Sequence, residues 1–314
     1  MLVVEDLAKV FPVKGGGQVH AVDGVSFRQQ RQETIGIVGE SGCGKSTLAR
    51  LILRLIEPTG GAVRFAGQDL MALPPSQLRL RRRDMQLIFQ DPYASLDPRL
   101  TVGAIVGEPL AIHGIGSRKE RRARVAELLA TVGLDADAAT RYPHEFSGGQ
   151  RQRIGIARAI ALEPKLIIAD EPVSALDVSI QSQILELLLD LKARLALSYI
   201  FISHDLAVVE HVSDRVAVMY LGRIVETTDT ESLYRRPAHP YTEALISAVP
   251  QPDPERDRTR IVLTGDIPNP ESPPPGCPFH PRCPKVLDVC PRELPVLKDI
   301  GEAGRPHLVA CHLH

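Results

Sequence analysis

The chain of 314 residues contains no tryptophan, few other aromatic residues and no bias toward either sign of charge. Its 37 basic and 38 acidic residues give a formal net charge of -1, so bulk charge offers no argument for a nucleic-acid partner, and we expect none. No stretch approaches the roughly 18 apolar residues of a membrane span. Met1 to Asp6 carries acids where a secretion signal needs basic residues. These absences predict a cytosolic protein that reaches a membrane only through partners.

Cysteine is also scarce, and five cysteines in a cytosolic protein do not predict structural disulfides. Four of them form the pattern Cys-x5-Cys-x6-Cys-x20-Cys near the C-terminus: Cys277, Cys283, Cys290 and Cys311. Zinc modules usually space their first pair by about two to four residues. Four openly spaced thiolates suit a [4Fe–4S] cluster, which could staple a tail that has a sparse core. Zinc, free thiols, and His280 or His312 as alternative ligands remain open.

Proline is concentrated in one part of the chain. Sixteen of the 26 prolines lie from Pro237 onward, which predicts an extended, irregular tail with one short helix near Tyr241 to Ala248. The preceding part has the apolar content of a large α/β domain, since 44% of the whole chain is hydrophobic. The sequence therefore predicts one large domain followed by an appendage.

A glycine-rich stretch, Gly39 to Thr47, follows an apolar run predicted to be a buried strand (34–38) and precedes a predicted helix (48–53). It fits the phosphate-binding loop pattern of a glycine, four free positions and Gly-Lys-Ser. Its glycines let backbone N–H groups converge on phosphate oxygens. Lys45 would neutralise the outer phosphates, Ser46 would ligate magnesium, and Thr47 would cap the helix or contact the α-phosphate. The loop residues are Gly39, Glu40, Ser41, Gly42, Cys43, Gly44, Lys45, Ser46 and Thr47.

Two later motifs also predict contacts with a phosphate or a metal ion. Ser147 to Gln150 opens a predicted helix, with Ser147 as its expected N-cap, and its glycines expose backbone N–H groups that could bind a second anion. The apolar run 166–169 predicts a buried strand that ends in Asp170 and Glu171. Burying two adjacent charges is costly, but a metal ion would offset the cost. We expect Asp170 to hold magnesium and Glu171 to polarise an attacking water.

Taken together, these motifs resemble the ATP-binding subunit of ABC transporters over residues 1 to about 235. The resemblance implies an α/β P-loop NTPase core with an antiparallel β subdomain and an inserted helical subdomain at about 92–162. A proline-rich extension (236–314) would follow it. ATP and Mg²⁺ are the implied cofactors.

The resemblance also implies roles for individual residues. Phe11 would stack on adenine, although a lone Phe is as often part of the core. Gln90 would sense magnesium and the γ-phosphate, Glu171 would be the base, and His204 would contact the γ-phosphate. Four residues would contact the ATP held by the opposite subunit of a head-to-tail dimer: Ser147, Gly148, Gly149 and Gln150. Asp177 is the remaining implied ATP contact. One departure from the family is Gln32, which stands where a turn usually has glycine.

A narrower resemblance is to oligopeptide and dipeptide importer ATPases, carried by four segments: 94–99, 142–146, 171–179 and 236–242. Importers of this group contain two paired ATPases, and the residue patterns of 147–153 and 172–177 are similar to those of the second of the two. This implies a paralogous ATPase partner in a heterodimer, two permease subunits and an extracytoplasmic substrate-binding protein. It also implies a peripheral position on the cytoplasmic face of the bacterial inner membrane, a di- or oligopeptide cargo, and a tail cluster. Nickel, glutathione or oligosaccharide as cargo, and a soluble ABC protein of DNA repair or translation, are the alternatives.

Overall fold

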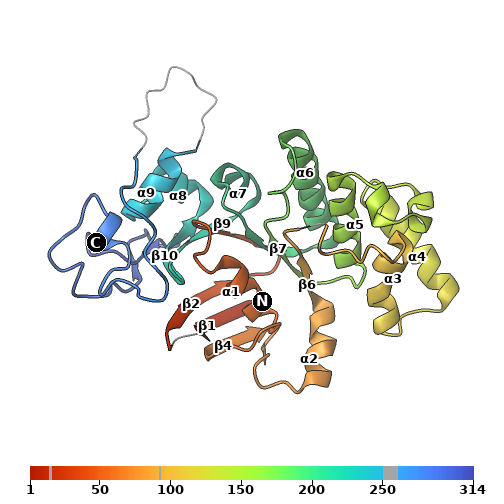
Figure 1. The fold of residues 1–314 in the computed structure, drawn as a ribbon, viewed down its shortest axis with the longest axis horizontal. Helices are drawn as coiled ribbons and strands as arrows, with labels where there is room; N and C mark the ends of the chain where they lie inside the picture. Colours follow the sequence, from red (N-terminus) through yellow and green to blue (C-terminus); the bar gives the residue numbers. More distant parts are fainter. Residues whose placement is uncertain (14–15, 92, 250–260) are drawn as a thin grey trace. The chain divides into compact units, whose positions relative to one another are not determined.

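The computed structural model describes residues 1–13, 16–91, 93–249 and 261–314, and the chain forms two compact units (Figure 1). The first unit combines Met1–Ala72 with Phe201–His314, and the second is Leu73–Ile200. The first 72 residues and the C-terminal tail therefore share one unit. No helix in the described parts of the chain is long and apolar enough to cross a membrane.

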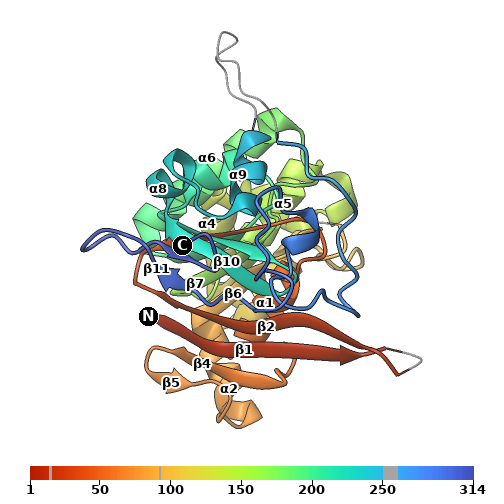
Figure 2. The same cartoon turned by 90° about the vertical axis from the view of Figure 1, so that its left-hand side faces the viewer.

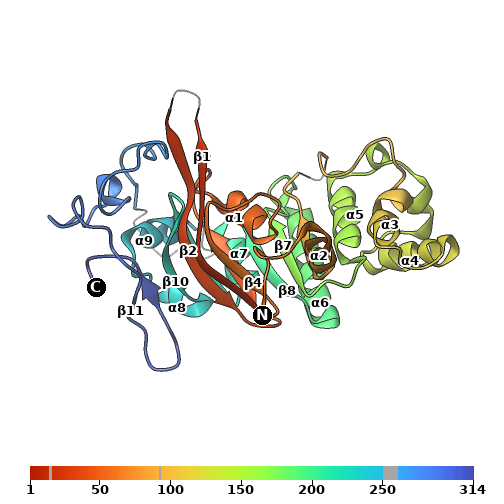
Figure 3. The ribbon, with the colours of Figure 1, turned by 90° about the horizontal axis from the view of Figure 1, so that it is seen from below.

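An antiparallel sheet in the first unit has the strand order β2-β1-β4-β5, and its long hairpin projects in the view from below (Figure 3). Its strands are β1 (Leu2–Pro12), β2 (Gln18–Gln29), β4 (Gly60–Phe65) and β5 (Gln68–Asp69). Phe11 lies inside β1, opposite Val19 of β2. The pairing of β1 with β2 shifts register three times. Such irregularities interrupt the apolar alternation along the strand, so sequence periodicity alone does not show its full length.

The other strands of the first unit carry the phosphate loop. β3 (Thr34–Val38) runs parallel to β9 (Arg215–Tyr220), which forms an antiparallel hairpin with β10 (Arg223–Asp229). All five residues of β3 are buried, as expected for a core strand of an α/β fold. The helices of this unit are α1 (Lys45–Ile52), α7 (Leu206–Val212), α8 (Thr230–Arg235) and α9 (Pro240–Ser247).

The proline-rich tail departs from its predicted irregular form. Besides α9, which matches the expected short helix, it forms β11 (Lys298–Asp299) and β12 (Leu308–Val309). β12 pairs antiparallel with β10 and with β11, so tail residues extend the sheet, beside the β10 label in Figure 2. Two-residue strands carry too little periodicity to be read from sequence, and pairing with β10 supplies the hydrogen bonds that fix them.

The second unit consists mainly of helices, and it includes the segment 92–162 for which the resemblance implies an inserted helical subdomain (Figure 1). They are α2 (Pro75–Arg81), α3 (Val102–Ile112), α4 (Arg118–Thr131), α5 (Gly148–Ile160) and α6 (Val178–Leu195). Two parallel strands, β6 (Met85–Ile88) and β7 (Leu166–Asp170), pair within it. β8 (Ser198–Ile202) spans the chain boundary between the units. The observed mixture of parallel and antiparallel strands with inserted helices confirms the predicted fold class.

The departure at Gln32 appears as a strained turn. Gln32 has a φ of 59° in the tight turn between β2 and β3, a backbone conformation that glycine adopts without steric cost. The predicted mismatch between residue and turn is therefore confirmed. A substitution to glycine at this turn should be tolerated by the backbone.

Candidate nucleotide-binding site

The Gly39–Thr47 segment connects β3 directly to α1, as the phosphate-loop pattern predicts. A Cβ at Gly39 would lie 2.1 Å from the Met219 carbonyl oxygen of β9, so no side chain fits there. Gly44 has a φ of 104°, and a Cβ on it would lie 2.0 Å from the Ala21 carbonyl oxygen of β2. Packing against two neighbouring strands thus explains both glycines. The loop is held where N–H groups at the start of α1 can receive an anion.

Lys45 is the first residue of α1 and is only 5% exposed. Its ammonium donates hydrogen bonds to the carbonyl oxygens of Gly39, at 2.7 Å, and Glu40, at 3.0 Å. These bonds hold the Lys45 ammonium within the phosphate loop, where phosphate oxygens could replace the two carbonyl oxygens as its partners. Burial raises the pKa of the neighbouring Cys43 thiol, so Cys43 is a neutral thiol in the loop.

Thr47 does not cap the helix. Gly44 occupies the cap position, no side chain bonds there, and Thr47 is the third helical residue. A glycine in the left-handed conformation takes the cap because the loop must turn sharply into α1, which leaves a phosphate contact as the remaining expectation for Thr47. Ser46 is the second residue of α1, within its first turn.

His204 and Phe11 lie in the same unit as the phosphate loop. His204 follows β8 and is exposed, and the next residue, Asp205, caps α7 by accepting a hydrogen bond from the Ala207 amide at 2.9 Å. Phe11 is half-buried, with the Lys9 ammonium 5.0 Å from its ring centroid. Phe11 is therefore not a core residue, and its ring keeps accessible surface on which a base could stack.

Gln90, Asp170 and Glu171 lie in the second unit, at the ends of the paired strands β6 and β7. The Gln90 amide nitrogen donates to a Glu171 carboxylate oxygen at 2.9 Å. Asp170, the last residue of β7, is 7% exposed. Glu171 has a φ of 47°, a conformation that costs a non-glycine residue energy and that recurs at functional sites. The two predicted residues Gln90 and Glu171 are thus brought together, and the backbone of Glu171 is strained.

Ser147 is the N-cap of α5, as predicted. Its hydroxyl accepts a hydrogen bond from the Gln150 amide at 3.3 Å, and the Gln150 side chain accepts one from the Ser147 amide at 3.0 Å. This reciprocal pair is a capping box. Gly149 has a second reason to be glycine, because a Cβ there would lie 2.4 Å from Ile180 Cγ2 of α6. The close packing of α5 on α6 keeps the start of α5 free of a side chain at this position.

Asp177 serves as the N-cap of α6. Its carboxylate accepts hydrogen bonds from the Ser179 hydroxyl at 2.7 Å and the Ile180 amide at 3.0 Å. The bond from Ser179, followed by that from Ile180, lowers the pKa of this carboxyl below its ordinary value. Asp177 therefore has a structural role, and the ATP contact that the family resemblance implies for it stays a prediction.

The sequence analysis missed a set of contacts between the tail and the phosphate loop. Arg282 donates two hydrogen bonds to the Glu40 carboxylate, at 2.7 and 3.0 Å. The Glu40 amide donates to the Tyr241 hydroxyl at 2.9 Å. Glu40 and Arg282 are 242 positions apart. No spacing rule connects such residues, so only the fold could reveal the pair.

The four tail cysteines are free thiols, three of them buried and Cys283 half-buried. Burial raises the pKa of Cys277 to about 11, with a smaller contribution from the thiols of Cys290, Cys311 and Cys283. Among the described residues, however, no group of three or more His, Cys, Asp or Glu side chains has the arrangement that holds a metal ion.

Two family models match the chain. Residues 22–174 match the ABC transporter family, and residues 225–290 match the oligopeptide/dipeptide transporter C-terminal region. The first match includes the phosphate loop and the acidic end of β7. The second covers α9 and three of the four tail cysteines.

Individual proteins are similar over nearly the whole chain. A probable peptide ABC transporter ATP-binding protein of Sinorhizobium fredii is 55% identical over 100% of this chain and 90% of its own. An oligopeptide transport ATP-binding protein of Bacillus subtilis is 53% identical over 100% and 97%.

Solved structures agree in fold. A dimeric ATP-binding cassette bound to ADP and phosphate is 30% identical, with a TM-score of 0.67, over 73% of this chain and 99% of its own. A component of an ABC transporter complex from Clostridium perfringens is 28% identical, with a TM-score of 0.66, over 75% and 90%. The chain therefore belongs to the ATP-binding subunits of the oligopeptide/dipeptide ABC transporter family, and it is an ATPase whose hydrolysis drives transport.

Proposed function

We propose that this chain is the ATP-hydrolysing motor of an importer for di- or oligopeptides. The observation that carries the hydrolytic part is the hydrogen bond between Gln90 and Glu171 at the strained end of β7. The peptide cargo is supported by the named transport functions of the relatives at 55% and 53% identity. We further propose that residues 1–235 act as the ATP-binding domain and 236–314 as an extension specific to this family.

Glu171 is the proposed base in this scheme. Its carboxylate would take a proton from the attacking water, and Gln90 would hold that carboxylate in orientation. Lys45 would exchange its carbonyl partners for phosphate oxygens, and His204 would contact the γ-phosphate. Because phosphoryl transfer proceeds by positioning and charge neutralisation, no covalent enzyme intermediate is required.

Magnesium would be held by Ser46, Asp170 and Gln90. Hydroxyl, carboxylate and amide oxygens are donors that Mg²⁺ accepts, and the low exposure of Asp170 suits a carboxylate whose charge a cation offsets. When bound, the ion would neutralise charge on the phosphate oxygens.

Substitution of the proposed base tests the hydrolytic role. Glu171→Gln keeps the size of the side chain but removes its basicity, so steady-state hydrolysis in the assembled transporter should fall by about a hundredfold or more while ATP still binds. Glu186→Gln makes the same change at an exposed carboxylate of α6, so it is the matched control and should retain turnover. Hydrolysis by Glu171→Gln at the parent rate would remove Glu171 as the base.

A second copy of the cassette would complete the site. Ser147, Gly148, Gly149 and Gln150 are proposed to contact ATP held by the opposite subunit, which we propose to be a paralogous ATPase. The exposed start of α5, with its capping box, supports an anion-binding role for this segment. The partners would be two permease subunits and an extracytoplasmic binding protein, at the cytoplasmic face of the bacterial inner membrane.

Isolation of the native complex tests the partners. The tagged chain should co-purify with two permeases and a second ATPase, and a peptide-binding protein should stimulate the hydrolysis of the reconstituted complex in the presence of peptide. Stimulation by nickel, glutathione or an oligosaccharide instead would overturn the peptide cargo. Recovery with ribosomes or DNA and without permeases would overturn the transport role.

The tail thiols are proposed to hold a [4Fe–4S] cluster. The Cys277 amide donates to the Cys290 carbonyl oxygen at 2.7 Å, which brings these two cysteines together, and the Leu287 amide donates to the Cys290 sulfur at 3.4 Å. Such N–H contacts to sulfur accompany thiolate ligands of iron–sulfur centres. When bound, the cluster would cross-link a segment with few regular elements.

Metal analysis tests the cluster. Anaerobically purified protein should contain iron and acid-labile sulfide, and Cys283→Ser should lose both. Cys43→Ser, in the phosphate loop, is the control that should keep them. Stoichiometric zinc without iron, or iron content unaffected by Cys283→Ser, would overturn the assignment.

A further inference from the structure

We propose that the C-terminal tail positions the phosphate loop for ATP through Arg282 and Tyr241, which both bind Glu40. This inference relies on the ATP-binding activity of the family, and it is independent of the cargo and of the cluster. Glu40 is the second residue of the loop. It follows Gly39 and precedes the residues whose N–H groups lie near the start of α1. A restraint on Glu40 is therefore a restraint on the entrance of the loop.

The contact between Arg282 and Glu40 is two-pronged and largely shielded from water. The two guanidinium nitrogens lie 2.7 and 3.0 Å from the two carboxylate oxygens. The side chains are 7% exposed for Arg282 and 24% exposed for Glu40. A paired, planar guanidinium and carboxylate in such surroundings fixes orientation as well as charge. The bonds to Glu40, which burial only partly opposes, raise the pKa of Arg282, so it stays charged.

Tyr241 holds the backbone of the same residue. Its hydroxyl accepts the Glu40 N–H at 2.9 Å, and its side chain is fully buried. The ring packs in an aromatic cluster, with centroids 4.7 Å from Tyr220 of β9 and 5.4 Å from Phe279 of the tail. Since β9 also supports the loop at Gly39, the cluster connects the tail, α9 and the sheet at the point where the loop begins.

The charge of Glu40 affects the interior of the loop. After burial and the opposing influence of Lys45, Glu40 contributes to the raised pKa of the Cys43 thiol. Without Arg282, this carboxylate would be uncompensated near the ammonium of Lys45, which already bonds to the Glu40 carbonyl. An uncompensated carboxylate would compete with phosphate for Lys45 and repel the triphosphate. Arg282 thus neutralises Glu40, and together with Tyr241 it lowers the ordering cost of nucleotide binding.

The proposal predicts a change in affinity with an unchanged maximal rate. Arg282→Gln should raise the Kd for a non-hydrolysable MgATP analogue about tenfold, the factor that one charged hydrogen bond is worth. Tyr241→Phe should raise it about threefold, since a buried N–H loses its acceptor. In steady-state assays KM should rise and kcat should stay within about twofold, because the lost interaction acts before the chemical step.

A double variant separates positioning from general destabilisation. Glu40→Gln combined with Arg282→Gln removes the uncompensated carboxylate, so the double variant should bind nucleotide more tightly than Arg282→Gln alone. A purely structural role would make the double variant as weak or weaker, and that outcome would overturn the proposal. If Arg282→Gln does not fold, Arg282→Lys keeps the charge without the paired geometry and should give an intermediate Kd.

Lys285→Gln is the matched control. Lys285 pairs with Glu243 of α9 at 2.7 Å, in the same tail but without contact to the loop, and its variant should bind nucleotide within about twofold of the parent. The nucleotide titration uses the full-length chain without permeases or peptide. Its Kd values therefore test the positioning role even if the proposed peptide import is wrong. A Kd for Arg282→Gln equal to that of Lys285→Gln would overturn the positioning role.

Discussion

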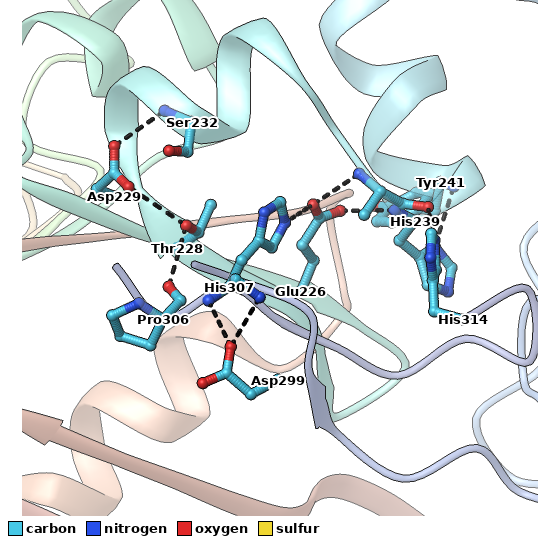
Figure 4. Close-up of polar contacts among 12 residues, drawn as sticks. Glu226, Thr228, Asp229, Ser232, His239, Tyr241, Asp299, Pro306, His307 and His314 are labelled. Carbon is cyan, nitrogen blue, oxygen red and sulfur yellow. Dashed lines mark hydrogen bonds and ion pairs between the residues drawn. The ribbon is translucent and has the colours of Figure 1, made fainter. Parts of the chain in front are cut away.

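Glu226 is the buried centre of the contacts that join the tail to β10 and α9 (Figure 4). Its side chain is 0% exposed, and its carboxylate accepts hydrogen bonds from the amides of Ala238 and His239 at 2.8 and 2.9 Å. His307 Nε2 lies 2.6 Å from Oε1. Burial alone would raise the pKa of this carboxyl, but the hydrogen bonds, led by that from His307, lower it. Glu226 is therefore ionised at neutral pH.

Removal of this carboxylate should cost substantial stability. Glu226→Ala leaves the buried donors of His307, Ala238 and His239 without an acceptor, and loss of one member of such a buried set costs roughly 3–5 kcal/mol. Glu226→Gln keeps one acceptor oxygen but turns an amide N–H toward a donor, so we expect a smaller loss of roughly 1–3 kcal/mol. The control, Glu231→Ala, breaks an exposed pair with Arg235 and should cost less than about 1 kcal/mol.

Urea denaturation followed by circular dichroism measures the loss, and amide hydrogen exchange localises it. Because Glu226 joins β10 to α9 and to the His307 segment before β12, exchange should accelerate in α9 and β12 before it does so in β3. A loss below about 1 kcal/mol for Glu226→Ala, with unchanged exchange in β12, would refute the reasoning.

Two further predictions concern acid stability and the phosphate loop. Burial lowers the pKa of His239 from an ordinary 6.5 to about 4. Above pH 6.5 the ring is neutral in both the folded and the unfolded chain, whereas between pH 6.5 and 4 only the unfolded chain binds the proton. The free energy of unfolding should therefore fall by about 3 kcal/mol as the pH drops from 6.5 to 4. His239→Asn keeps a helix-capping acceptor without titration and should remove this acid sensitivity in urea melts; an unchanged pH profile would contradict the assignment. Gly44→Ala and Gly42→Ala both place alanine at a positive φ, 104° and 81°, but only the Cβ of Gly44→Ala lies 2.0 Å from the Ala21 carbonyl oxygen, so Gly44→Ala should weaken ATP binding more than Gly42→Ala. Equal affinities of the two variants in nucleotide titrations would contradict the packing argument.

Much of the fold could be predicted because its signals are local. The apolar run 34–38 and the glycines after it predicted β3 and the loop, since strand burial and left-handed turns leave direct traces in composition. Ser147 with Gln150 predicted an N-cap for the same reason. The register shifts of β1 and the pairing of β12 were missed, because both depend on strands that are remote in the chain.

The sequence by itself determined the family, the order of the ATP-site motifs and the positions of the tail cysteines, because spacing within a motif is a local property of the chain. Only the tertiary structure decided what Glu40 does. Its neighbours in sequence identify it as a loop residue, whereas its partners Arg282 and Tyr241 come from a tail 201 to 242 positions away. Folding creates such contacts because the tail and the first 72 residues pack into one unit, and residue patterns along the chain carry no record of that proximity.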